Sequence, residues 1–137
     1  MVIKSRTENL SDIREFIHSL VLKVGVSAEV TEDIILAVDE ACTNIIKHSY
    51  KFFPDGEIIV KMKYADNKVL ITIIDYGEHF QPHKISKPDL QEYYKHKKVG
   101  GLGMYLMKTL MDDVKYSSVP GKYNQVLMTK YINSGSS

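Results

Sequence analysis

The chain has 137 residues, the length of one ordinary domain. Its 44% hydrophobic and 26% charged residues are typical of a globular domain and exclude an intrinsically disordered chain. Lys and Arg total 18 against 17 Asp and Glu, so a dedicated nucleic-acid binder is not expected. The longest apolar run, Ile34 to Val38, is too short to span a bilayer, and the first ten residues lack the apolar segment of a signal peptide. We therefore expect a cytoplasmic protein that makes no membrane contact.

The chain shows no sign of an internal domain boundary. No linker rich in Pro, Gly or Ser divides it, so we expect one domain over residues 1–132 and a disordered tail over 133–137. Its single cysteine, Cys42, lies within an apolar stretch. This setting favours a small buried hydrophobic side chain over a nucleophile.

The first third of the chain predicts a short strand and two helices. Residues 2–6 fit a strand, and apolar residues at helical spacing then follow a plausible N-cap at Ser11. Gly25 is a good terminator for that first helix. The second helix is expected from about residue 28 to residue 48, and it is apolar around much of its circumference, which indicates that other elements cover it.

The remainder predicts paired strands around one long polar segment. A tight turn is expected at Asp66-Asn67, and the polar segment, broken by two prolines, is typical of a functional loop or lid. The predicted elements are strands at 58–64 and 69–74, the lid at 76–100, a helix at 104–111, and a hairpin of 114–119 with 125–132. Strands that come in hairpin pairs predict an α+β fold, with a mixed or antiparallel sheet and helices on one face.

Two polar residues stand out in the second predicted helix. Glu40 and Asn44 are one helical turn apart beside an apolar stripe, and His48 continues the same column. One interpretation is ordinary polarity of a helix surface, with His48 packed at the helix end. The other is a metal-and-nucleotide site, in which the amide oxygen holds Mg²⁺ beside phosphate oxygens and the carboxylate acts as a base.

Two further patterns are weak when each is taken alone. Asp75 ends a predicted strand, where its carboxylate could accept a hydrogen bond from an exocyclic amine, and Gly77 would let the backbone approach a flat ring. The same spacing also occurs in common turns. Gly100-Gly101-Leu102-Gly103 opens a predicted helix whose backbone N–H groups could bind phosphate, but it also fits a merely flexible helix start.

Taken together and in order, the three patterns are far more specific, and they resemble the GHKL ATP-binding superfamily. The resemblance covers nearly the whole chain. More narrowly, the segments EACTNIIKHSY and GGLGMYLMKTLMDDV resemble the bacterial anti-sigma factor serine/threonine kinases of the general-stress and sporulation type. The patterns that carry the wider resemblance are Glu40-x-x-x-Asn44, Asp75-x-Gly77 and Gly101-x-Gly103.

The resemblance implies a two-layer α/β sandwich, with a mostly antiparallel sheet, that binds ATP and Mg²⁺. It implies that Glu40 is the catalytic base, that Asn44 coordinates Mg²⁺, and that Asp75 binds the adenine amino group beside Gly77. A lysine and the glycine-rich segment would lie at the phosphates. These residues are Lys98, Gly100, Gly101, Leu102 and Gly103.

The resemblance also implies a function and partners. The chain would phosphorylate an anti-sigma factor antagonist, bind a sigma factor, and act as a homodimer. Two departures from the family pattern are His79, where many members have a second glycine, and Val99, where some have an arginine. Val99 keeps open a second interpretation, a nucleotide-binding module with little or no phosphotransfer. A third interpretation, the catalytic domain of a histidine kinase, is disfavoured because no phosphoacceptor helix precedes the first predicted helix.

Overall fold

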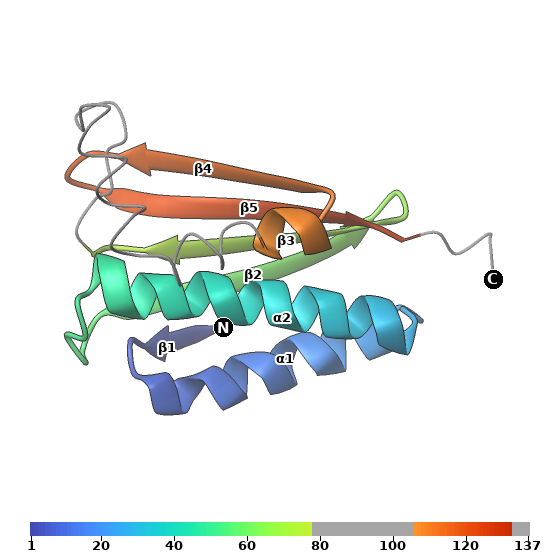
Figure 1. Ribbon diagram of the computed structural model, residues 1–137, viewed down its shortest axis with the longest axis horizontal. Helices are drawn as coiled ribbons and strands as arrows, with labels where there is room; N and C mark the ends of the chain where they lie inside the picture. The colour runs from blue at the N-terminus through green and yellow to red at the C-terminus, as the bar shows by residue number, and fades with distance from the viewer. Residues whose placement is uncertain (78–105, 133–137) are drawn as a thin grey trace.

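In the computed structural model, two helices lie against one face of a five-stranded sheet (Figure 1). The structure describes residues 1–77 and 106–132. Neighbouring strands in the order β1-β2-β3-β5-β4 are all antiparallel, so the predicted two-layer α+β architecture is confirmed without a parallel pair in the described part. The strands are β1 (Val2–Lys4), β2 (Glu57–Ala65), β3 (Lys68–Asp75), β4 (Asp113–Val119) and β5 (Tyr123–Tyr131).

Helix α1 (Leu10–Lys23) buries one apolar stripe against the rest of the domain. Ile13, Ile17 and Val21 recur every four residues, and all three are buried. The helix ends as predicted at Gly25, whose φ of +76° an L side chain rarely adopts. Ser11 is not the N-cap, because a short 3₁₀ turn (Thr7–Asn9) starts the helix earlier, and the Ser11 hydroxyl instead donates to the Glu8 carbonyl at 3.3 Å.

Helix α2 (Ala28–Asn44) starts at a side-chain cap and ends in an unusual turn. The Ser27 hydroxyl accepts a hydrogen bond from the Val30 N–H at 3.3 Å, which satisfies one donor of the first turn. The helix then continues as a π-helical segment (Ile45–Ser49), with the Tyr50 N–H donating to the Ile45 carbonyl at 2.9 Å. The predicted extent of the helix is therefore right, but the wider last turn takes His48 off the predicted α-helical column.

The central hairpin of the sheet has the turn that its sequence predicts. Asp66 and Asn67 have φ values of +54° and +59°, as a two-residue type I′ turn requires. Ala65 pairs with Lys68 across it, so β2 and β3 are in register along their length.

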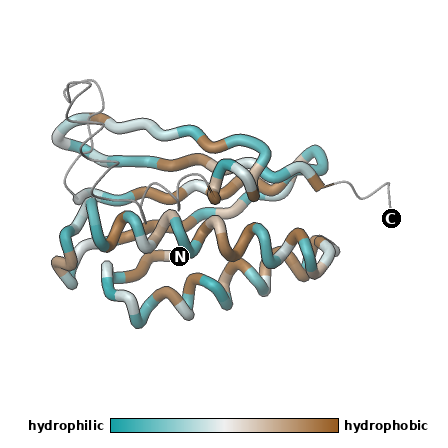
Figure 2. Tube along the Cα trace, viewed as in Figure 1, coloured by the Kyte–Doolittle hydropathy of each residue, from teal (hydrophilic) through white to brown (hydrophobic). Residues whose placement is uncertain are grey.

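The hydrophobic core lies between the helices and the sheet. Strand β3 is central, and its helix-facing residues Val69, Ile71 and Ile73 have no exposed surface. Figure 2 shows hydrophobic positions repeating along both helices and the middle strands. A short helical stretch at 106–110, within the helix predicted at 104–111, adds Met107 to this core. In the described residues, no helix has the length and apolar character needed to cross a membrane.

The buried cysteine gives the first testable prediction. Cys42 is fully buried in α2, as its sequence context predicts, and burial together with the negative charges of Asp39 and Asp75 raises the pKa of its thiol far above the ordinary range. Because the thiolate is the reactive form, Cys42 should resist a thiol reagent at pH 8 in the native protein. In urea it should react at the rate of a free cysteine. Fast native labelling, followed by mass spectrometry, would contradict the burial.

Candidate active site

A buried carboxylate at the end of β3 organises the polar end of the sheet. Asp75 is only 3% exposed, and three donors from three segments converge on its Oδ1 atom. The Gly77 N–H donates at 3.0 Å, the Asn124 amide at 2.9 Å, and the Ser49 hydroxyl makes the third hydrogen bond. Buried charges are tolerated when hydrogen bonds compensate for lost hydration, and these three donors do so.

The other oxygen of Asp75 is available to a ligand. Among the described residues, no donor forms a hydrogen bond with Oδ2. In the same residues, every completely buried side-chain oxygen or nitrogen has a hydrogen-bond partner. Oδ2 is therefore not completely buried, although the residue as a whole has little exposed surface. An ionised carboxylate accepts hydrogen bonds only, so this atom suits a ligand that presents an N–H donor.

The π-helical segment brings Ser49 to this carboxylate. Ser49 follows α2 directly, and π-helical turns occur frequently at functional sites. Gly77 packs so closely on this turn that an added Cβ would lie 2.7 Å from the carbonyl oxygen of Ser49. A close approach between protein segments therefore requires glycine at position 77, whereas the predicted approach of a flat ring stays a prediction.

Tyr50 joins the same end of the molecule to the start of β2. Its hydroxyl donates to the Glu57 carbonyl at 2.5 Å and accepts from the Tyr76 N–H at 2.8 Å. Burial is the main cause that raises the pKa of Tyr50, which favours the protonated form that donates to Glu57. The backbone on either side of Asp75 is thus held by hydrogen bonds.

Glu40 and Asn44 lie on the last turns of α2, the part of the helix nearest Asp75. The charge of Asp75 acts on the buried thiol of Cys42, which lies between them in sequence, and Ser49 contacts Asp75 directly. Both Glu40 and Asn44 are half-buried. Within the described ranges, neither side chain makes a hydrogen bond or an ion pair. Half-buried polar groups without protein partners are what a polar ligand would satisfy.

Comparison with known proteins gives the family. The model of the histidine kinase-like ATPase domain matches residues 3–130. The serine-protein kinase RsbW of Listeria monocytogenes is 36% identical over 135 residues, which cover 96% of this chain and 85% of that protein. The RsbW of Bacillus subtilis strain 168 is 33% identical over 138 residues, with coverage of 97% and 84%. The chain belongs to the RsbW-type serine-protein kinases of the histidine kinase-like ATPase family. The resemblance stated from its motifs is thereby confirmed.

Solved structures agree with the fold of this RsbW-type chain. A blue-light activated histidine kinase from Erythrobacter litoralis EL346 matches with a TM-score of 0.61 and 16% identity, over 81% of this chain and 33% of that one. The histidine kinase domain of the same protein matches with a TM-score of 0.59 and 16% identity, over 93% of this chain and 61% of that one. The chain thus spans about a third of the first structure and about three-fifths of the second. At 16% identity, the likeness concerns the fold alone.

The structure brings four of the predicted site residues to one end of this RsbW-type domain and leaves five outside its description. Glu40, Asn44, Asp75 and Gly77 lie on α2 and at the end of β3. The predicted phosphate-binding residues are outside the described ranges, namely Lys98, Gly100, Gly101, Leu102 and Gly103.

Sequence reasoning missed three polar residues near Asp75. Ser49, Ser118 and Asn124 were not identified as site residues, although all three are connected to it. A signal for the last two was present in the alternation of the final hairpin. Ser118 and Asn124 fall on the helix-facing side of β4 and β5, where hydrophobic residues such as Val126 and Met128 are otherwise found.

No group of three or more His, Cys, Asp or Glu side chains in the described ranges could hold a metal ion. A magnesium ion bound chiefly through nucleotide phosphates does not need such a cage, because Mg²⁺ keeps several water ligands and takes one or two from protein. The amide of Asn44, which has no partner among residues 1–77 and 106–132, fits that limited role.

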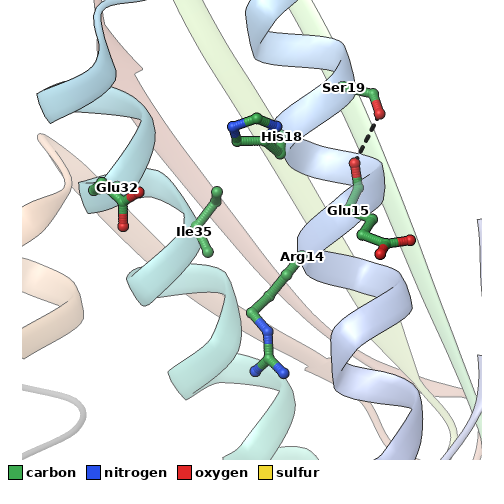
Figure 3. Close-up of a pocket in the computed structure, with 6 residues that line it drawn as sticks. All are labelled: Arg14, Glu15, His18, Ser19, Glu32 and Ile35. Carbon is green, nitrogen blue, oxygen red and sulfur yellow. Dashed lines mark hydrogen bonds between the residues drawn. The ribbon is translucent and has the colours of Figure 1, made fainter.

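A shallow groove between α1 and α2 lies elsewhere (Figure 3). Four α1 residues, with Glu32 and Ile35 from α2, line it. Arg14 at its edge pairs with Asp39 at 2.7 Å, and Ser19 donates to the Glu15 carbonyl at 2.8 Å. Its polar groups are exposed, and none belongs to the cluster around Asp75, so it is a weaker candidate for chemistry.

The close approach at Gly77 yields a prediction about stability. Gly77→Ala should lower the free energy of unfolding by about 1–3 kcal/mol, since the added methyl group overlaps backbone atoms of Ser49. Urea denaturation measures this loss. Ser49→Ala in the Gly77→Ala background is the control, because it removes the hydroxyl but leaves the backbone carbonyl. Full recovery of stability in the double variant would show that the backbone does not limit the site.

Proposed function

We propose that this chain is an ATP-dependent protein-serine/threonine kinase that phosphorylates an anti-sigma factor antagonist and sequesters a sigma factor. The observation that carries the proposal is the pair Glu40 and Asn44 on the last turns of α2, half-buried and without partners among the described residues, together with the Oδ2 atom of Asp75, which no described donor reaches. Its RsbW relatives are named serine-protein kinases. One end of the domain therefore offers an acceptor for a nucleobase and two groups for phosphoryl chemistry.

The nucleotide would bind with its base at the end of β3. The exocyclic amine of adenine would donate to Oδ2 of Asp75, the atom that no donor in residues 1–77 and 106–132 reaches. Guanine carries a carbonyl at the equivalent position, which would place two acceptors against each other. The carboxylate therefore selects ATP over GTP. The loss of a hydrogen bond to a charged group corresponds to about 1.5–3 kcal/mol.

The phosphates would extend toward the last turns of α2. The Asn44 amide oxygen would hold Mg²⁺ there, and the ion would neutralise charge on the phosphates during transfer. We propose Lys98, Gly100, Gly101, Leu102 and Gly103 as further phosphate contacts, on the sequence resemblance, since these residues lie outside the described ranges.

Glu40 would act as the general base. As the serine or threonine hydroxyl attacks the γ-phosphorus, its proton passes to the Glu40 carboxylate. A new P–O bond to the hydroxyl oxygen forms while the bond to the leaving oxygen of ADP breaks. Because the transition state spreads charge over phosphate oxygens, positioning and charge neutralisation contribute more than covalent chemistry by the protein.

The partners follow from the family resemblance. An anti-sigma factor antagonist would supply the acceptor hydroxyl, a sigma factor would bind a separate surface, and the kinase would act as a homodimer. Sigma factors work with RNA polymerase, so these interactions would occur in the cytoplasm. No nucleic-acid contact is proposed, in keeping with the balanced net charge of +1.

Two variants of α2 test the separate roles proposed for Glu40 as the base and Asn44 as the magnesium ligand. Glu40→Gln should bind Mg·ATP about as tightly as the wild type, yet transfer phosphate about 10²–10⁴-fold more slowly, because the base is removed and the nucleotide contacts remain. Asn44→Ala should instead weaken Mg·nucleotide binding. Isothermal titration calorimetry and γ-phosphate transfer to the co-purified acceptor protein, on the same samples, separate the two effects.

Glu32→Gln is the matched control, an identical change at an exposed position of the same helix. It should leave both measurements unchanged. Transfer at the wild-type rate by Glu40→Gln would remove Glu40 from the mechanism. A wild type that binds Mg·ATP but transfers phosphate to no co-purified protein would favour the nucleotide-binding module without transferase activity.

A further inference from the structure

A row of polar side chains crosses three strands on the helix-facing side of the sheet. Ser118 of β4 pairs with Asn124 of β5, which in turn pairs with Asp75 of β3. The Ser118 hydroxyl donates to the Asn124 side-chain oxygen at 2.8 Å, and the Asn124 amide nitrogen donates to Oδ1 of Asp75 at 2.9 Å. The three side chains are thus linked by hydrogen bonds that run in one direction, toward the carboxylate.

The chemistry of this row fixes which way the Asn124 amide points. An ionised carboxylate only accepts hydrogen bonds, so the NH₂ end of Asn124 must face Asp75. The opposite end is then an acceptor, and the Ser118 hydroxyl supplies its donor. A reversed amide would place the Asn124 oxygen against Oδ1 of Asp75, where two acceptors repel each other.

These hydrogen bonds fix the orientation of the Asp75 carboxylate. With Asn124, Ser49 and the Gly77 N–H all on Oδ1, the plane of the carboxyl group is held, and Oδ2 is left without a donor from the described part of the chain. We propose that Asn124, oriented by Ser118, is a positioning residue that sets nucleobase selectivity by directing Oδ2 of Asp75 toward the exocyclic amine of adenine. This inference rests on the proposed nucleotide site.

The test compares the binding of three ligands by calorimetry: Mg·ATP, Mg·GTP and Mg·tripolyphosphate, which has no base. Asn124→Asp has nearly the same shape but places a second carboxylate against Asp75. It should weaken ATP binding roughly 10- to 100-fold, as the loss of a charge-assisted hydrogen bond implies, and reduce the ATP-to-GTP preference. Tripolyphosphate affinity should stay unchanged. Ser118→Ala should show the same pattern at about 2- to 10-fold, as for a neutral hydrogen bond.

Ser117→Ala is the matched control, because Ser117 is the neighbouring serine on the same strand and pairs with Gln125 on the other face of the sheet. It should leave all three affinities unchanged. If Asn124→Asp does not fold, as judged by circular dichroism, Asn124→Ala replaces it, because that change removes the donor without adding a charge. In phosphotransfer assays, Ser118→Ala should raise KM for ATP and leave kcat unchanged, which a general loss of structure would not do.

The outcomes separate this inference from the proposed function. A wild type that binds GTP as well as ATP would overturn both, since Asp75 would then not recognise the base. If the wild type prefers ATP and Asp75→Asn abolishes the preference, the base site stands. Retention of the wild-type preference by the Asn124 and Ser118 variants would then overturn the positioning role alone. An equal loss for all three ligands would show that Asn124 is merely structural.

Discussion

The burial of the Asp75 carboxylate is the constraint on which the polar end of this domain depends. An unpaired buried charge costs on the order of several kcal/mol, so donors must be brought to it. Two of the three come from segments distant in sequence, the turn after α2 and strand β5. The third is the backbone of Gly77, two residues along the chain.

Several irregular features of the fold are explained by that constraint. The π-helical segment Ile45–Ser49 ends at the residue whose hydroxyl donates to Asp75. Gly77 is needed because the chain after β3 lies against that turn. The ring of Tyr50 packs on Gly56, while its hydroxyl holds the backbone at Glu57 and Tyr76. Among the described residues near Asp75, hydrogen bonds satisfy Oδ1 but leave Oδ2 and the side chains of Glu40 and Asn44 without a partner.

The secondary structure was largely predictable, because each signal was local. The apolar period of α1, the Asp66-Asn67 turn and the apolar run of β3 depend on neighbours within a few residues. The start of α1 was predicted wrongly at Ser11, since a serine at the right spacing can bond to a preceding carbonyl as readily as cap a helix. A change from α to π geometry at Ile45 has no sequence pattern that identifies it.

The candidate site was predictable only in part. Glu40, Asn44, Asp75 and Gly77 were found because they form a spaced pattern shared with a known superfamily. Ser118 and Asn124 were not, because their role arises from strand pairing between β3, β5 and β4, which joins residues about 50 positions apart in sequence. Only a polar interruption on the inward side of a hairpin pointed to them, and such an interruption has many possible causes.

The central claim is that an adenine nucleotide binds at the end of β3 beneath the last turns of α2. Titration of the isotopically labelled protein with Mg·ATP and Mg·GTP, followed by NMR of its backbone and side-chain amides, tests this most directly. The account predicts saturable shifts for Gly77, Ser49, the Asn124 amide and residues 40–44 with ATP, and much weaker ones with GTP. Shifts that are equal for both nucleotides, or that cluster in the groove between α1 and α2, would contradict it.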